Sequence, residues 1–134
     1  MSSKAVDLRS PLSRARGLGS AKEGVHHWIA QRMTGVALLP LSLWLVFSLI
    51  SFDKLDYGSV ADWLRTPKAA VLILAFIVCA FYHAYLGMQV IFEDYVHEPW
   101  MKYLSLIALR LSCWVLGLAA VYAVLRVALG VVAI

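Results

Sequence analysis

Three long runs without an acidic side chain alternate with short polar segments along the chain. The first run covers residues 33–52, twenty residues between Arg32 and Asp53. The second covers residues 69–92, and the third covers residues 103–125. At about 1.5 Å per helical residue, twenty residues extend about 30 Å, which matches the hydrocarbon core of a bilayer. Each run therefore predicts a membrane-spanning helix.

Composition supports the same class of protein. Of the 134 residues, 62% are apolar and 15% are charged, and the mean hydropathy is +0.78. Ordinary soluble domains have roughly 45–50% apolar and about 25% charged residues. A chain of this size leaves much of its surface exposed, so these apolar side chains must face lipid or partner helices. We expect an all-α membrane protein with three transmembrane helices. Arg110, two turns inside the third run, is close enough to extend its charged end to the membrane surface.

Basic residues are distributed unevenly between the two sides of the predicted spans. The net charge is +4, but six of the twelve Lys and Arg residues lie in the first 32 positions, so we expect membrane-surface contact and no nucleic-acid partner. With Lys102 and Arg110 the N-terminal side carries seven or eight, and the other side carries four. The positive-inside rule then predicts a cytoplasmic N-terminus and an outer C-terminus. Residues 1–32 are expected to form a basic cytoplasmic arm and interfacial segment, and residues 33–134 the three-helix anchor. A transit peptide is a less favoured interpretation of the first 24 residues, because Met1 is present.

Small residues and cysteines inside the runs have simple interpretations. Cys79 and Cys113 show neither a disulfide framework nor metal-ligand spacing, so both are expected to be buried thiols. Gly35, Gly87 and Gly117 are single small residues that favour close helix packing.

His83 is the ionisable residue of interest in the second run. An imidazole near the middle of an apolar span is costly unless a partner compensates it. His83 lies about 14 Å from the cytoplasmic end of the run, too deep to reach water. Gly87 follows one turn later on the same face, where a flat macrocycle could approach the helix. Two interpretations remain open: a haem ligand, or a histidine that hydrogen-bonds to a neighbouring helix.

Asp94 and Tyr95 lie where the second run ends. Asp94 follows His83 by eleven residues, which places it within about 20° of the same helix face and about 16 Å further along the axis. Tyr95 offers a phenol at the boundary between apolar and polar regions, where it could meet the carbonyl of a lipid-soluble quinone. The alternative is a solvated helix end with an interfacial tyrosine. Acidic residues at a helix C-terminus oppose its dipole, which weighs against that alternative.

Two segments resemble a known family. The stretch HAYLGMQVIFEDYV at 83–96 resembles the hydrophobic membrane anchor of succinate dehydrogenase, in which an H-x3-G core is followed at eleven and twelve residues by Asp-Tyr. The stretch GVHHWIAQRMTG at 24–35 is similar to the start of that family's first helix, with His26 and Arg32 six positions apart. The resemblance covers all three runs, and the basic N-terminal segment and HHW tract are similar to alphaproteobacterial members.

This resemblance implies a role in succinate:ubiquinone oxidoreductase, respiratory complex II, in the bacterial inner membrane, with the C-terminus in the periplasm. The chain would be one of two small anchors on which a flavoprotein subunit and an iron-sulfur subunit dock. It would form half of a heteromeric helix bundle around a haem b shared with the sister anchor, with ubiquinone as substrate. By this resemblance, His83 is the axial ligand of the haem iron, and Tyr95 and Asp94 bind quinone. Arg32 and His26 would lie near the haem propionates or the quinone cavity.

The residues alone add one constraint and leave two alternatives. The chain has one histidine at the depth of the predicted haem, so a six-coordinate iron would need its second ligand from another chain. The chain also lacks a Gly-rich nucleotide motif and a cysteine cluster, so we expect dicarboxylate chemistry in partner subunits and no catalytic residue here. One alternative is a three-helix structural or assembly protein in which His83 only joins helices. The other is a carrier subunit, which should show intramembrane acids, and none lies inside these runs.

Overall fold

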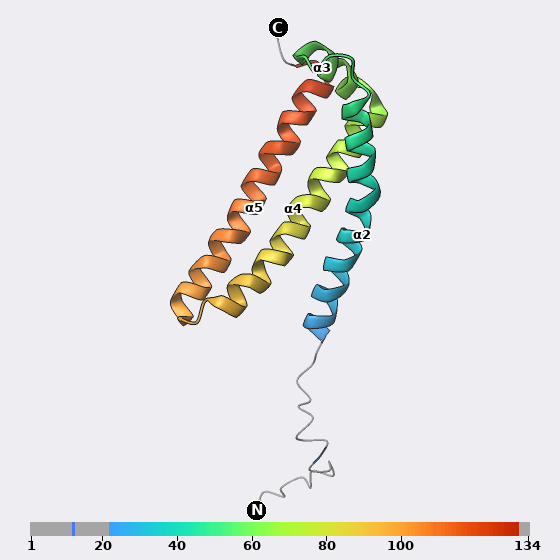
Figure 1. Ribbon diagram of the computed structural model, residues 1–134. Helices are drawn as coiled ribbons and strands as arrows, with labels where there is room; N and C mark the ends of the chain where they lie inside the picture. Colours follow the sequence, from blue (N-terminus) through green and yellow to red (C-terminus); the bar gives the residue numbers. More distant parts are fainter. Residues whose placement is uncertain (1–11, 13–21, 132–134) are drawn as a thin grey trace, which may run out of the picture.

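The fold is entirely helical in the part of the chain that the structure describes. A computed structural model describes residue 12 and residues 22–131, so most of the predicted arm lies outside the described residues. Residues 22–131 form three long helices and one short helix and contain no strand: α2 (Lys22–Ile50), α3 (Tyr57–Arg65), α4 (Pro67–Tyr95) and α5 (Pro99–Ala128) (Figure 1).

The three long helices confirm the predicted spans, because each is long and apolar enough to cross a bilayer. Their bounds differ from the apolar runs. The first helix begins at Lys22 rather than at residue 33, and the third begins at Pro99 rather than at residue 103. A charged side chain ends an apolar run, but it does not interrupt backbone hydrogen bonding, so the helices extend beyond the hydrocarbon layer. Prolines at the first helical position fix the starts of α4 and α5.

The three long helices lie in the order α2, α4, α5. The central α4 packs against both neighbours, whereas α2 and α5, both within the described residues, do not pack against each other (Figure 1). The N-terminal end of α2 and the α4–α5 connection lie at one end of the molecule, and α3 lies at the other. We call this arrangement an open half-bundle, because α2 and α5 do not close over α4 and leave one side of it uncovered by the other described helices.

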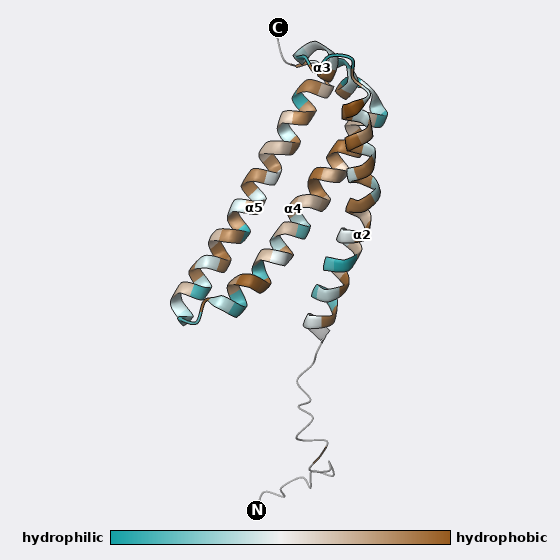
Figure 2. Ribbon diagram, viewed as in Figure 1, coloured by the Kyte–Doolittle hydropathy of each residue, from teal (hydrophilic) through white to brown (hydrophobic). Residues whose placement is uncertain are grey.

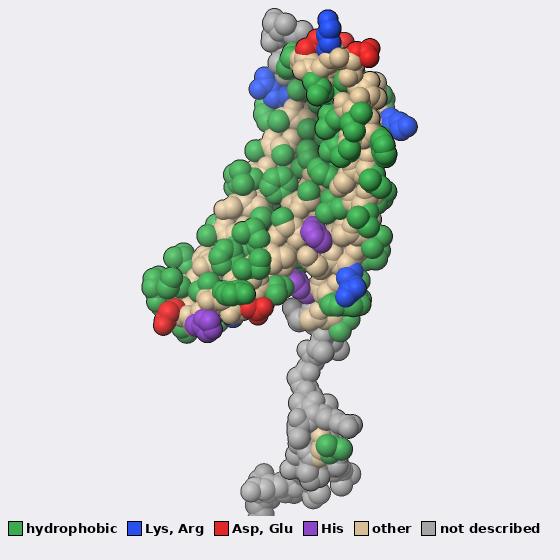
Figure 3. Space-filling model, viewed as in Figure 1, with side chains coloured by type: hydrophobic (Ala, Val, Ile, Leu, Met, Phe, Trp, Pro, Cys, Tyr) green, Lys and Arg blue, Asp and Glu red, His purple; other side chains and the backbone are tan. Residues whose placement is uncertain are grey.

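The described part of the chain buries very little of itself. Only four hydrophobic residues are buried, Ala61, Ala69, Leu86 and Leu109, while Phe47 is 69% exposed and Trp114 is 65% exposed. Hydrophobic residues cover the long sides of the helices, and most charged side chains lie toward the two ends (Figures 2 and 3). So much exposed apolar surface on a monomer indicates contact with lipid and with partner helices.

Each of the three glycines inside the spans lies against a side chain of a neighbouring helix, which confirms the packing interpretation. A Cβ atom would stand 3.4 Å from His83 Cε1 at Gly35, 3.4 Å from Gln31 Nε2 at Gly87, and 3.5 Å from Phe81 Cγ at Gly117. Gly87 therefore faces a side chain of α2 within this chain. The two cysteines are free and half-buried.

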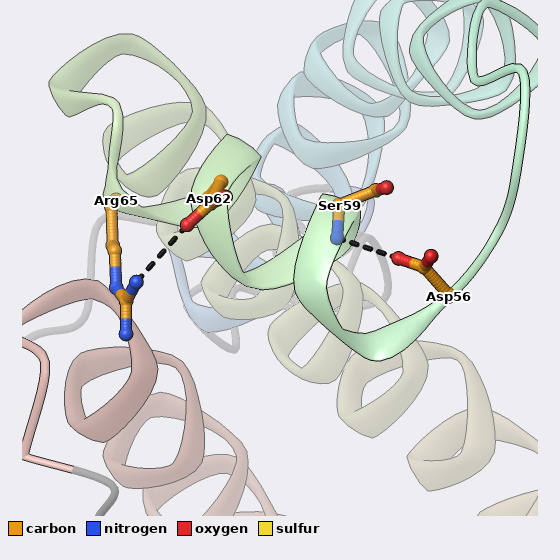
Figure 4. Close-up of polar contacts among 4 residues, drawn as sticks. All are labelled: Asp56, Ser59, Asp62 and Arg65. Carbon is orange, nitrogen blue, oxygen red and sulfur yellow. Dashed lines mark hydrogen bonds and ion pairs between the residues drawn. The ribbon is translucent and has the colours of Figure 1, made fainter. Parts of the chain in front are cut away.

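The short helix α3 was not predicted, because its polar sequence falls between two apolar runs. Asp56 caps its N-terminus by accepting a hydrogen bond from the Ser59 amide at 2.7 Å, and Arg65 pairs with Asp62 at 3.0 Å near its C-terminus (Figure 4). Trp63 stacks on Trp44 of α2, with ring centroids 5.6 Å apart and 20° between the ring planes. The helix therefore closes one end of the half-bundle.

The Asp56 cap predicts a pH-dependent helix end. The Ser59 amide and then the Ser59 hydroxyl hold the pKa of the Asp56 carboxyl below its ordinary value. The stabilisation is therefore present above the unfolded-state pKa and is lost as pH falls through the lower, folded-state pKa. We expect faster hydrogen exchange of the Ser59 amide in Asp56→Ala but not in Asp56→Asn, which retains a capping oxygen. Equal exchange in wild type and Asp56→Ala would contradict the cap.

Candidate functional site

A groove that contains several polar side chains, called the polar groove below, lies between α2 and α4, toward the N-terminal end of α2. Its volume is about 570 Å³, and it is lined by Gly24, His27, Trp28, Gln31, Arg32, His83 and Val90. On α4, His83, Gly87 and Val90 follow one another at helical spacing, so they form one stripe directed toward α2. The groove brings together two histidines, an amide and a guanidinium beside otherwise apolar spans.

His83 is half-buried and hydrogen-bonded to α2. Its Nδ1 lies 3.0 Å from Thr34 Oγ1, and its Nε2 lies 3.4 Å from the Gln31 side-chain nitrogen. Thr34 Oγ1 also lies 2.8 Å from the Ala30 carbonyl oxygen, to which it donates. The cross-helix bond matches the packing interpretation of His83, but the threonine engages only one ring nitrogen. The second nitrogen remains directed at the amide in the groove.

Two buried polar atoms in this groove lack hydrogen-bond partners among the described residues. They are His27 Nε2 and Gln31 Oε1. Buried polar atoms are paired in the great majority of folded proteins, so these two mark positions in the groove whose hydrogen bonds the described residues do not supply. Both come from α2, and His27 is half-buried in the wall of the groove.

Arg32 lines the groove, and its guanidinium lies 4.3 Å from the centre of the Trp28 ring. No carboxylate among residues 24–131 pairs with it. The neighbouring histidines of α2 differ in position. His26 is exposed and does not line the groove, whereas His27 does. A guanidinium stacked on an aromatic ring keeps its donors available for an anionic group.

Asp94 and Tyr95 lie at the last turn of α4. The helix runs unbroken from His83 to Tyr95, so Asp94 continues the stripe directed toward α2. Both side chains are exposed, Tyr95 by 78%, and neither forms a side-chain hydrogen bond with another described residue. Lys102 of α5 donates to the Glu93 carbonyl at 2.8 Å and so satisfies one of the free carbonyls at this helix end.

A second hollow of about 390 Å³ lies between α4 and α5 and has an almost wholly apolar lining. Arg110 borders it, with its guanidinium 5.9 Å from the centre of the Tyr85 ring. Cys113 also lines it. Its lining also includes Tyr82 and Tyr85 but no histidine and no carboxylate, so it lacks the combination of polar groups found in the α2–α4 groove.

Thr34 is the site residue that sequence reasoning missed. One signal was available. A histidine deep in an apolar span needs a polar partner at the same depth, and Thr34 is the first hydroxyl inside the first run. Assigning the pair also required the register between two antiparallel helices, which no single-sequence pattern provides.

The three apolar helices, with several polar side chains gathered in a groove between two of them, define a multi-pass membrane protein. Residues 7–129 match the family model described as succinate dehydrogenase/fumarate reductase transmembrane subunit. The chain is 36% identical over 118 residues to the succinate dehydrogenase hydrophobic membrane anchor subunit of Rickettsia conorii, covering 87% of this chain and 94% of that protein. Identity to the protein of the same description from Paracoccus denitrificans is 29% over 126 residues, covering 93% and 96%.

The chain belongs to the family of succinate dehydrogenase membrane anchor subunits. It is therefore part of an enzyme complex that contains other subunits and lies in a membrane. The resemblance carried by the 24–35 and 83–96 segments is confirmed at the level of the family.

Proposed function

We propose that this chain is the small anchor of a respiratory succinate:ubiquinone oxidoreductase, in which His83 provides one axial ligand of a haem b. One observation carries the proposal: the imidazole lies in the middle of a membrane-spanning helix, on the wall of a polar groove, with Nε2 outside the threonine hydrogen bond. A haem bound there would supply one-electron redox chemistry. Complex that contains His83 should hold haem b, and complex with His83→Leu should lack it or bind it weakly.

The residues of the groove fit such a group. A neutral imidazole binds iron through a nitrogen lone pair, and His83 Nε2 is the nitrogen that the threonine leaves free. The Gln31 amide, 3.4 Å from Nε2, would have to turn aside for the iron to bind there. Arg32 offers a cation to propionate carboxylates, and the unpartnered His27 Nε2 offers a further polar contact. His26, exposed one position earlier, does not line the groove and would approach such a group only from outside it. The second axial ligand would come from the sister anchor.

The open half-bundle supports this sharing. Since α2 and α5 do not pack against each other, helices of a sister anchor have access to α4 between them. Many apolar side chains of this chain are exposed. Those that do not face lipid would be buried against the sister anchor, and this burial would drive the association of the two anchors. The chain would thus be one half of an obligate heteromeric bundle.

We further propose that Tyr95 and Asp94 form part of the ubiquinone-reduction site. The exposed Tyr95 hydroxyl can donate to a quinone carbonyl, whose oxygen gains negative charge on reduction. Asp94, one residue earlier, can orient neighbouring donors and pass protons from the aqueous phase. Neither residue is enclosed by the described part of the chain, and in this proposal the sister anchor and the iron-sulfur subunit would complete the site.

The distribution of basic residues supports a cytoplasmic location for the groove end of the molecule. Trp28 and Trp100 lie at that end, and Tyr57 and Trp63 lie at the other, as expected for aromatic residues at the two interfaces. The flavoprotein and iron-sulfur subunits would then dock on the cytoplasmic side of the bacterial inner membrane, next to the proposed quinone site.

Reporter fusions test this orientation. Fusions after Asp53 and at the C-terminus should report the outer side, and fusions at the N-terminus and near Glu98 should report the cytoplasm. The reason is that three spans place the two termini on opposite sides, and the basic excess selects which one stays inside. A cytoplasmic C-terminus would contradict the topology, because it requires an even number of spans.

A further inference from the structure

We propose that Thr34 is a positioning residue for His83, and this inference rests on the proposed haem function. Its hydroxyl oxygen accepts a hydrogen bond from His83 Nδ1–H at 3.0 Å. That bond fixes the tautomer in which Nε2 keeps its lone pair. A ligand histidine must present an unprotonated nitrogen to the metal, so Thr34 prepares the imidazole for its task.

The direction of this hydrogen bond follows from the other contacts of the threonine. Thr34 Oγ1 lies 2.8 Å from the Ala30 carbonyl oxygen and 3.1 Å from the Gln31 carbonyl oxygen, and both carbonyls only accept. The single hydroxyl proton is used in this contact with the preceding turn, a common arrangement for threonine in a helix. The lone pairs of Oγ1 then remain for His83, and Nδ1 must carry the proton.

Two neighbouring residues of α2 hold the ring in this position. Gly35 packs against the imidazole, since a Cβ there would stand 3.4 Å from His83 Cε1, at van der Waals contact. The Gln31 side-chain amide lies against the other ring nitrogen, with its nitrogen 3.4 Å from Nε2. The tautomer itself is selected by the Thr34 contact at Nδ1.

The hydrogen bond has a consequence beyond orientation. A hydrogen-bond acceptor at the ring nitrogen that does not bind the metal makes the imidazole more basic. The bond between the other ring nitrogen and the metal is then stronger. A more basic ligand favours the oxidised, more positive iron. Thr34 should therefore lower the midpoint potential of the haem and slow its loss from the complex.

The experiment uses the complete purified complex with Thr34→Val, which keeps the shape of the side chain and removes its hydroxyl, and Thr34→Ser, which keeps the hydroxyl. Redox titration gives the midpoint potential, and transfer to an excess of a haem-scavenging protein gives haem affinity. We expect Thr34→Val to raise the potential and weaken haem binding about 10- to 100-fold. Thr34→Ser should stay close to wild type.

Ser105→Ala is the matched control, because Ser105 Oγ makes the same kind of bond to the Met101 carbonyl, at 2.6 Å, on α5. It should change neither quantity. If Thr34→Val does not assemble, Thr34→Ala is assayed with the same expectation. The inference would be overturned if Thr34→Val kept the wild-type midpoint potential and the wild-type rate of haem transfer. It would also be overturned if Thr34→Ser or Ser105→Ala changed these quantities as much as Thr34→Val does. His83→Leu separates the two proposals. If His83→Leu leaves the haem unchanged, the proposed haem function is wrong. If His83→Leu loses its haem while Thr34→Val behaves as wild type, only the role of Thr34 is refuted.

Discussion

Replacing His83 by leucine should remove most of the haem from the complex. Loss of a partner that only supports a ligand costs about 10–100-fold in metal affinity, so loss of the ligand itself should cost more. Another histidine of this chain is poorly placed to substitute, since His27 lies about 10 Å further along α2 than Thr34. The measurement is the ratio of haem to flavin in purified complex, with the midpoint potential of any haem that remains.

His97→Leu is the control for this substitution. His97 is exposed, and its Nδ1 donates to the Tyr95 carbonyl at 3.0 Å in the α4–α5 connection. The control should keep its haem, whereas the His83 variant should also melt at lower temperature, because a bound haem stabilises the assembled anchors. An unchanged haem spectrum and potential in His83→Leu would refute the ligand assignment.

Replacing Tyr95 by phenylalanine should slow quinone reduction without removing the haem. The change keeps the ring and deletes one hydroxyl, so α4 should fold as before. A lost hydrogen bond to a developing charge is worth about 1.5–3 kcal/mol, which corresponds to a fall of roughly 10- to 150-fold in the rate of ubiquinone reduction. Succinate oxidation with a soluble artificial acceptor should barely change, because dicarboxylate chemistry is assigned to another subunit.

Tyr103→Phe provides a matched control for the quinone assay. Tyr103 is 69% exposed and lies on α5 at the same end of the molecule. Loss of its hydroxyl should leave both rates near wild type. If Tyr95→Phe keeps both rates, the quinone assignment fails. An equal fall in both would show instead that Tyr95 holds the complex together.

The spans could be predicted from the sequence because the cost of placing charge in lipid controls them. Runs of about twenty residues without an acidic side chain located three helices that the structure confirms. Their ends could not be predicted in the same way. The first turns of α2, from Lys22 to Arg32, contain charge but continue the helix outside the hydrocarbon layer. The helix α3 was missed because its stability depends on the Asp56 cap and on packing of Trp63 against Trp44.

The candidate site was predictable where one residue sufficed and not where two helices had to be aligned. His83 was found because an isolated imidazole in an apolar span needs a partner. That partner, Thr34, depends on how α2 and α4 face each other. The same limit applies to the adjacent histidines: successive residues of a helix differ by about 100° in direction, so sequence similarity led to His26 while the groove is lined by His27.

The most direct test of the central claim is a reduced-minus-oxidised absorption spectrum of the purified wild-type complex, with its subunits identified and its haem and flavin quantified. The proposed function predicts the spectrum of a b-type haem, one haem per flavin, in a complex that contains this chain, a sister anchor, a flavoprotein and an iron-sulfur subunit. A complex with these subunits that reduces ubiquinone with succinate and contains no haem would contradict it.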